Sequence, residues 1–225
     1  MKQKLLIFGT GKISESVSYF FNRDSSYEIV AYLLDDEYIN GNLFLGKPVI
    51  SVSSCDQIYS PKEYHAFVAV GYQGMNSLRT DKVNLLKNKG YKLASYISPN
   101  VLGDFVVGEN TIIMDHAMIQ PCAKFGDNVF VWGGAMIGHH AEIKDNCWIT
   151  GGALIGGITI IKQNTFVGLG AIIGHEIIVG EKCMIGAGTI ACTPVNDGTV
   201  LIEPNTIAHR LNSDQFTRMS TCFRV

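Results

Sequence analysis

Short apolar runs alternate with segments of helical periodicity over the first hundred residues. The runs that predict buried strands are 5–9 (LLIFG), 27–36 (YEIVAYLLDD) and 65–71 (HAFVAVG). Residues 13–21 and 75–89 place apolar side chains at helical spacing. This alternation is typical of a parallel sheet with helices on its faces. We therefore predict a small Rossmann-like α/β domain over residues 1–98, which ends at a turn-forming Ser-Pro-Asn cluster.

From Val101 onward the apolar pattern has a period of six. Fifteen consecutive positions at this spacing, from Val101 to Ile185, carry a large apolar residue, and the fourth residue after each is Ala, Thr, Val or Cys in thirteen of the fifteen units. This is the hexapeptide repeat of a parallel β-helix, in which each unit supplies a short strand and a corner. Three units close one coil, so residues 99–190 are predicted to form about five coils, roughly 24 Å tall.

The repeat is lost after Ile190. Because solenoids of this type need covered ends, we predict that residues 191–225 form a C-terminal cap or extension. It would contain a closing strand or loop and a short terminal helix over residues 213–223 (SDQFTRMSTCF). The predicted architecture is thus an α/β domain, a parallel β-helix and a short C-terminal extension.

Composition narrows the functional classes. The chain has 225 residues, with 18 Lys and Arg against 20 Asp and Glu and a net charge of −2, which argues against binding nucleic acid through bulk charge. No apolar run reaches the roughly 18 residues of a membrane span. The first strand ends in a glycine turn rather than a cleavage site, so we expect a cytoplasmic protein without a membrane partner. The six cysteines form no Cys-x-x-Cys pair, and we expect no bound metal.

Three features together make the chain resemble the NeuD/PglD-like sugar acyltransferases. They are the GTGK turn at 9–12, the LLDDE strand end at 33–37 and a hexapeptide domain that contains GHHAEIKDN at 138–146. The resemblance extends from Lys4 to about Thr189. It implies a left-handed β-helix, which inverts the usual right-handed crossover, and a homotrimer with acetyl-coenzyme A in the groove between neighbouring prisms. It also implies a nucleotide-linked amino sugar as acceptor, with its nucleotide held by the N-terminal domain.

The resemblance places the catalytic histidine of the family at His139. An imidazole can take the proton of an amine near neutral pH. Where a carboxylate often follows the base in relatives, this chain has His140, with Glu142 two residues further on. His140 either orients His139 or is itself the base, and the sequence leaves both possibilities open.

The same corner supplies the residues expected to bind acetyl-coenzyme A. Gly157 lies 18 residues after His139, and His175 lies 18 residues after Gly157, so the three are predicted to stack on successive coils. The resemblance aligns Gly156 and Gly157 with a segment whose amide contacts the thioester region, where an N–H would stabilise an oxyanion. The alternative is that glycine only permits the corner, and that His175 is a solvated corner residue. Trp148 aligns with a second histidine of relatives, and is expected against the pantetheine or at a subunit interface.

The N-terminal domain carries the expected nucleotide-sugar site. The predicted substrate-binding residues are Gly9, Gly11, Lys12, Asp35, Asp36 and Gly71. Ser14 replaces the third glycine of G-x-G-x-x-G, so a dinucleotide site is weakly indicated. A helix N-terminus nevertheless suits a phosphate, and Lys12 adds charge. The two aspartates are expected to bind ribose or base, or else to cap a helix, and Arg79 to reach a phosphate or lie on the helix surface.

These observations predict an N-acetyltransferase that uses acetyl-coenzyme A. The acceptor is a nucleotide-linked 4-amino-dideoxy sugar for surface polysaccharide (O-antigen) or glycan synthesis, attacked directly through its amine with a histidine base. Sugar O-acetylation of the sialic-acid type needs the same base and is the first alternative. A second alternative is a metal enzyme of the γ-carbonic anhydrase class, with His139, His140 and His175 as ligands. A third is a non-catalytic nucleotide-sugar-binding β-helix, because residues 193–210 replace the Gly-x-Pro-Ala-like ending of many relatives.

Overall fold

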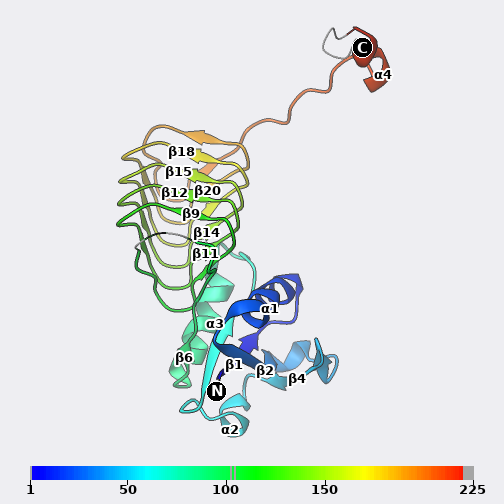
Figure 1. Ribbon diagram of the computed structural model, residues 1–225, viewed down its shortest axis with the longest axis vertical. Helices are drawn as coiled ribbons and strands as arrows, with labels where there is room; N and C mark the ends of the chain where they lie inside the picture. The colour runs from blue at the N-terminus through cyan, green and yellow to red at the C-terminus, as the bar shows by residue number, and fades with distance from the viewer. Residues whose placement is uncertain (1, 102, 104, 220–225) are drawn as a thin grey trace.

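The structure is a computed structural model that describes residues 2–101, 103 and 105–219. It consists of an α/β domain, a β-helix whose coils stack into a prism, and a C-terminal segment that extends away from both (Figure 1). This confirms the predicted fold class, a small Rossmann-like domain followed by a left-handed parallel β-helix.

The N-terminal domain is built on a six-stranded sheet with the order β3-β4-β2-β1-β5-β6. Its strands are β1 (Gln3–Phe8), β2 (Tyr27–Leu34), β3 (Leu43–Phe44), β4 (Lys47–Ser51), β5 (Tyr64–Val68) and β6 (Lys92–Leu93). Its helices are α1 (Lys12–Asp24), η1 (Asp36–Tyr38, 3-10), α2 (Cys55–Ile58) and α3 (Ser77–Asn88). Side chains alternate between the two faces of β1: Leu5 and Ile7 share a buried cluster with α1, whereas Leu6 and Phe8 share one with α3. The three predicted runs are therefore the central strands of the sheet.

Three parallel sheets form the faces of the β-helix, and each strand pairs with the strand one coil away, as Val131 pairs with Ile149. One face packs against the N-terminal domain and is called the docked face. It consists of β7 (Tyr96–Ile97), β8 (Ile112–Ile113), β11 (Phe130–Val131), β14 (Trp148–Ile149), β17 (Phe166–Val167), β20 (Met184–Ile185) and β22 (Val200–Leu201). The apolar face consists of β9 (Met118–Ile119), β12 (Met136–Ile137), β15 (Leu154–Ile155), β18 (Ile172–Ile173) and β21 (Ile190–Ala191). The third face consists of β10 (Lys124–Phe125), β13 (Glu142–Ile143), β16 (Ile160–Ile161) and β19 (Ile178–Val179).

The six-residue repeat fills the axis of the prism. The large apolar residue of each unit from Ile113 to Ile185 lies in one continuous buried cluster. The small residues at the corners, such as Ala141, Cys147 and Cys183, belong to the same cluster. The pattern read from the sequence is therefore the core of the domain, because side chains one coil apart stack directly on one another.

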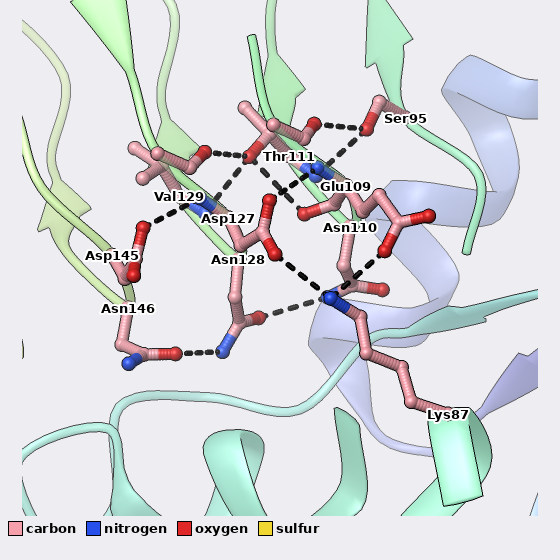
Figure 2. Close-up of polar contacts among 12 residues, drawn as sticks. Lys87, Ser95, Glu109, Asn110, Thr111, Asp127, Asn128, Val129, Asp145 and Asn146 are labelled. Atoms are coloured by element: carbon pink, nitrogen blue, oxygen red, sulfur yellow. Dashed lines mark hydrogen bonds and ion pairs between the residues drawn. The ribbon is translucent and has the colours of Figure 1, made fainter. Parts of the chain in front are cut away.

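An asparagine ladder lines the corner between the third face and the docked face. Asn110, Asn128 and Asn146 have positive φ values of 53°, 59° and 61°, a conformation that asparagine tolerates better than most residues. The Nδ2 group of Asn110 donates to Oδ1 of Asn128 at 2.8 Å, and Nδ2 of Asn128 donates to Oδ1 of Asn146 at 2.8 Å (Figure 2). The ladder reaches the sheet of the first domain, since the Val68 N–H donates to Oδ1 of Asn110 at 2.7 Å.

Arg79 of α3 joins the two domains from a fully buried position. Its Nε donates to Oδ1 of Asn128 at 2.9 Å, and its Nη2 donates to the Asn128 carbonyl at 3.0 Å. The guanidinium lies 4.6 Å from the ring centre of Phe130 and 5.0 Å from that of Trp148. No described carboxylate forms an ion pair with it, and burial lowers its pKa to about 9. Both sequence interpretations of Arg79, a phosphate ligand and a surface residue, are therefore wrong.

Ion pairs surround this buried contact. Arg23 of α1 binds Asp115 of the β-helix at 2.6 Å, and the guanidinium lowers the pKa of that carboxyl. Lys87 of α3 binds both Glu109 and Asp127 at 2.8 Å (Figure 2). The N-terminal domain is thus held on the docked face by apolar packing at the centre and by charged pairs around it.

The C-terminal extension begins as the sequence predicts and then leaves the prism. Strand β22 closes the docked face by pairing with β20. From Ile202 the chain runs out from the prism, largely exposed, to a short helix, α4 (Ser213–Met219) (Figure 1). The predicted terminal helix is confirmed over the described residues.

Replacing Arg79 by Ala should lower the free energy of unfolding by about 3 kcal/mol, because the change leaves several buried carbonyl and amide oxygens without a donor. Urea unfolding followed by tryptophan fluorescence measures the loss. Arg210→Ala removes the same charge from the exposed C-terminal segment and should leave the unfolding curve unchanged. Equal stability of the two variants would contradict the anchoring role of Arg79.

Candidate active site

The candidate catalytic residues lie on the corner between the apolar face and the third face. His139, Gly157 and His175 occupy the same position on three successive coils, as the spacing predicts. The ring centres of His139 and His175 are 5.8 Å apart, and the rings are inclined at 54°. The two imidazoles therefore contact one another across the intervening glycine.

Gly157 provides the space that the His139 imidazole fills. A Cβ atom placed on Gly157 would lie 2.7 Å from Nε2 of His139 and 2.9 Å from Cε1, both too close for a real contact. Gly156 has a different constraint, because a Cβ there would lie 2.6 Å from the backbone of Gly174. Gly157 therefore leaves room for the His139 side chain, and Gly156 allows two coils to stack closely. Their predicted contact with acetyl-coenzyme A remains a prediction.

His140 holds the other edge of the His139 ring. The two Nδ1 atoms are 3.2 Å apart, so one ring donates its Nδ1–H to the other. The backbone N–H of His139 donates to Oε1 of Gln120 at 2.9 Å. His140 itself has a positive φ of 56°, and its ring is inclined at 84° to that of His139. The Nε2 atom of His139 makes no hydrogen bond with any described protein group, and is the ring nitrogen open to a substrate.

A cavity of about 300 Å³ lies at the carboxyl ends of β1 and β5. The residues that line it include Gly9, Thr10, Gly11, Lys12, Leu34, Gly71 and Gln73. Gly9 has φ +118°, and a Cβ there would lie 2.8 Å from the Ala69 carbonyl, so only glycine fits this turn. Gly11 occupies the N-cap position of α1 and has no side chain that could bond to the first amides of the helix. These amides are therefore free to bind an anion. The Lys12 ammonium is bound to Glu15 at 2.9 Å.

The two predicted aspartates are engaged elsewhere. Asp35 binds Lys82 at 2.7 Å. Asp36 accepts hydrogen bonds from the hydroxyls of Ser51 and Ser53, which lower the pKa of its carboxyl. Neither carboxylate lines the cavity. Their predicted contact with ribose or base requires that these partners be exchanged. Asp35 occupies the N-cap position of η1, but its side chain makes no capping hydrogen bond there.

An aromatic cavity of about 450 Å³, not predicted from the sequence, lies between the loop after β5 and the docked face. Its lining residues include Ile13, Tyr72, Trp132, Trp148, Phe166 and Leu169. Phe130, Trp148 and Phe166 point outward on successive coils, and this 18-residue aromatic spacing was the available signal. Trp148 is stacked on Phe130 at 4.7 Å and is 2% exposed. Within one chain it packs beneath the N-terminal domain, away from the histidine corner.

Comparison with known proteins finds a matching domain family and similar solved structures. Residues 4–86 match the family model of the PglD N-terminal domain. The acetyltransferase domain of PglB from Neisseria gonorrhoeae is 27% identical, with a TM-score of 0.79 over 88% of this chain and 96% of that one. The chain is thus similar to the NeuD/PglD-like sugar acyltransferases. The same PglB domain has been solved in complex with acetyl coenzyme A, and matches equally well.

More distant structures share the fold of this acyltransferase. PerB from Caulobacter crescentus, in complex with CoA and GDP-perosamine, is 20% identical with a TM-score of 0.75 over 88% of this chain and 92% of its own. WeeI from Acinetobacter baumannii is 20% identical with a TM-score of 0.72 over 88% and 96% of the two chains. No protein of curated function matches the sequence significantly.

A single chain of this acyltransferase separates the two parts of the predicted site. The cavity at the start of α1 belongs to the domain on the docked face, whereas His139 lies on the corner opposite that face. The sequence spacing does not show that one prism keeps the two groups of predicted residues apart.

Among the described residues, no cluster of three or more His, Cys, Asp or Glu side chains is arranged to hold a metal ion. No helix in this part of the chain is long and apolar enough to span a membrane.

Replacing Gly157 by Ala should lower kcat at least tenfold while the melting temperature changes by less than about 3 °C. The added methyl group meets the His139 side chain rather than backbone, so the chain still folds but the His139 ring moves. Steady-state kinetics and thermal unfolding measure the two effects.

Gly156→Ala is the matched control, because its methyl group meets the backbone of the next coil. It should lower the melting temperature clearly. A Gly157→Ala enzyme with unchanged kcat would show that the seated position of His139 is not the active one, whereas a raised KM for acetyl-coenzyme A alone would favour a pantetheine contact.

Proposed function

We propose that this acyltransferase moves the acetyl group of acetyl-coenzyme A to the amine of a nucleotide-linked 4-amino-dideoxy sugar, with His139 as general base. The observation that carries the proposal is the seating of His139: Gly157 leaves room for the ring, His140 holds Nδ1, and Nε2 is open to a substrate. The complexes of the PglB domain with acetyl coenzyme A and of PerB with CoA and GDP-perosamine support the choice of substrates.

The reaction is a direct acyl transfer. The free amine attacks the thioester carbon, the C–N bond forms and the C–S bond breaks. The amine proton passes to Nε2 of His139, which then returns it to the departing sulfur. A covalent acyl-enzyme on Cys147 is disfavoured, because burial raises the pKa of that thiol to about 12 and its side chain faces the core. A backbone N–H of the Gly156–Gly157 corner is the proposed donor to the oxyanion.

The nucleotide is proposed to bind in the cavity at the start of α1. The free amides of α1 and the bare Gly9 turn suit a diphosphate. Gly71 borders the same cavity. The Lys12 ammonium, which now pairs with Glu15, would add positive charge after moving from that carboxylate to the phosphate. We place the reaction in the cytoplasm, in the synthesis of a surface polysaccharide or glycan.

We further propose a homotrimer in which each active site is shared. Five outward side chains run up the apolar face, one per coil, and no described part of the chain covers them: Met118, Met136, Leu154, Ile172 and Ile190. Met118 and Ile190 are 60% and 59% exposed. Such a stripe beside the histidine corner suits a second copy of the prism. A neighbour seated there brings its own N-terminal domain towards His139, which a single chain does not.

Thiol release from acetyl-coenzyme A, measured with a panel of nucleotide-linked 4-amino sugars and their 4-hydroxy analogues, tests the reaction. We expect turnover with an amino sugar and none with its hydroxyl counterpart. His139→Ala should lower kcat at least about a hundredfold, because the general base is lost. It should still bind acetyl-coenzyme A in calorimetry, because the groove between neighbouring prisms is unchanged.

His116→Ala is the control, since His116 is an exposed histidine on a different corner and its loss should leave kcat unchanged. Turnover of hydroxyl analogues alone would replace the proposal by O-acetylation. Failure to bind acetyl-coenzyme A at all would favour a non-catalytic protein. A fully active His139→Ala enzyme would remove His139 as the base.

Leu154→Glu should convert the trimer to monomers and abolish turnover, because it places a charge in the centre of the apolar stripe. Sedimentation velocity and the thiol-release assay measure both changes. Ile58→Glu adds the same charge at an exposed apolar position of α2 and should remain trimeric and active.

Mixed assemblies give a sharper test of the shared site. Chains with His139→Ala and chains with Thr10→Trp, which fills the nucleotide cavity, are each inactive alone. Together they should recover part of the wild-type rate, since some sites then combine an intact cavity with an intact histidine. An active Leu154→Glu monomer would contradict the shared site.

A further inference from the structure

We propose that His175 and Glu176 form a positioning pair for His139, in which Glu176 supplies the negative charge that the residue after the base, His140, cannot. The inference rests on the proposed function of His139. It gives His175 a different role from the predicted coenzyme contact.

The first support is the contact between the two rings. The imidazole of His139 lies over Gly157, the residue one coil above, which has no side chain to occupy this space. His175 lies at the same corner one coil further on, and its ring centre is 5.8 Å from that of His139. The His139 ring thus lies between His140, whose Nδ1 pairs with its own Nδ1, and His175 two coils above. A ring held on both sides has fewer orientations to lose when the substrate arrives.

The second support is the fixing of His175 itself. Its Nε2 lies 3.2 Å from Oε1 of Glu176. Glu176 has a φ of 59°, and its backbone N–H donates to the Gly157 carbonyl at 3.0 Å. This corner geometry turns the carboxylate back towards the ring of its own neighbour. The carboxylate therefore lies beside the ring of His175 that contacts His139, with both side chains more than half exposed.

The third support is the distribution of charge around the corner. The carboxylate of Glu142, the nearest acid along the chain after His139, is held by Lys124 at 3.2 Å and by Lys144. Glu176 pairs with no described lysine or arginine, and its partner is His175. The groups that face His139 are His140 on its own corner, Gln120 from the coil below and His175 from two coils above. Glu176 is therefore the carboxylate available to balance a positive charge at this site.

The chemistry needs such a charge. During the reaction the amine proton moves to Nε2 of His139, which becomes an imidazolium, and leaves again with the sulfur of the coenzyme. A carboxylate behind the neighbouring imidazole favours the charged form of the base at that moment. The pair does not touch the substrate in this proposal and acts through His139.

Glu176→Gln should lower kcat about tenfold with KM unchanged for both acetyl-coenzyme A and the amino sugar. His175→Asn should have a similar effect, because it removes the ring through which the carboxylate acts. Glu181→Gln is the matched control: it removes the same charge from the same coil, one corner further on, and should leave kcat unchanged.

A double-mutant cycle decides the mechanism. If Glu176 acts through His139, the Glu176→Gln change has no further effect in an enzyme that already carries His139→Ala. An equal tenfold loss in both backgrounds would overturn the positioning role. A raised KM for acetyl-coenzyme A with unchanged kcat would return His175 to a coenzyme contact. A fully active His139→Ala enzyme would instead refute the proposed function, so the two failures are distinguishable.

Discussion

Vertical stacking at a fixed coil spacing is the constraint on which the rest of this molecule depends. Because residues one coil apart lie directly above one another, each corner and each face repeats a single local environment. Isoleucine and valine repeated along the axis make the core, and asparagines repeated at one corner make a hydrogen-bonded ladder. Outward aromatic side chains on successive coils make the surface on which the first domain rests. The histidine cluster arises in the same way, from one corner position on alternate coils with a glycine between them.

The second determinant is a buried cation without a buried anion. Arg79 satisfies its donors with amide and carbonyl oxygens and lies against two aromatic rings. These oxygens belong to the asparagine ladder and to the backbone of the coils, so the contact is specific to the register of the β-helix. The ladder also reaches Val68, next to the cavity at the end of β5. The position of this cavity relative to the coils is therefore defined by hydrogen bonds as well as by apolar packing.

Much of the fold was predictable from the sequence, because the six-residue period has a single structural meaning. The period also placed His139, Gly157 and His175 on one corner. What it could not show is the direction of side chains at that corner. That the His139 ring folds over Gly157 depends on the conformation of His140 and on the absence of a Cβ at Gly157, which no spacing reveals. Asp35 and Asp36 were predicted as ligands from their place at a strand end, and their serine and lysine partners come from distant segments.

Two further limits have the same origin. Arg79 is a polar residue on a helix of modest amphipathicity, and its burial depends on a second domain whose docking the sequence pattern does not encode. The aromatic cavity arises from outward positions of the repeat, which are read as solvent-facing when a prism is considered alone. Sequence periodicity thus describes the interior of each domain well and its contacts with other domains poorly.

The stacking of corners also limits how the length of this domain can change during evolution. Loss or gain of one or two residues within the coils would rotate every later strand onto a different face and separate the histidines, the asparagines and the axial side chains from their partners. Gain or loss of a whole coil would leave all of these contacts intact above and below the change. The β-helix is therefore expected to vary in length among related chains in steps of one complete turn, and the segment after Ile202, which lies outside the stack, is free to vary residue by residue.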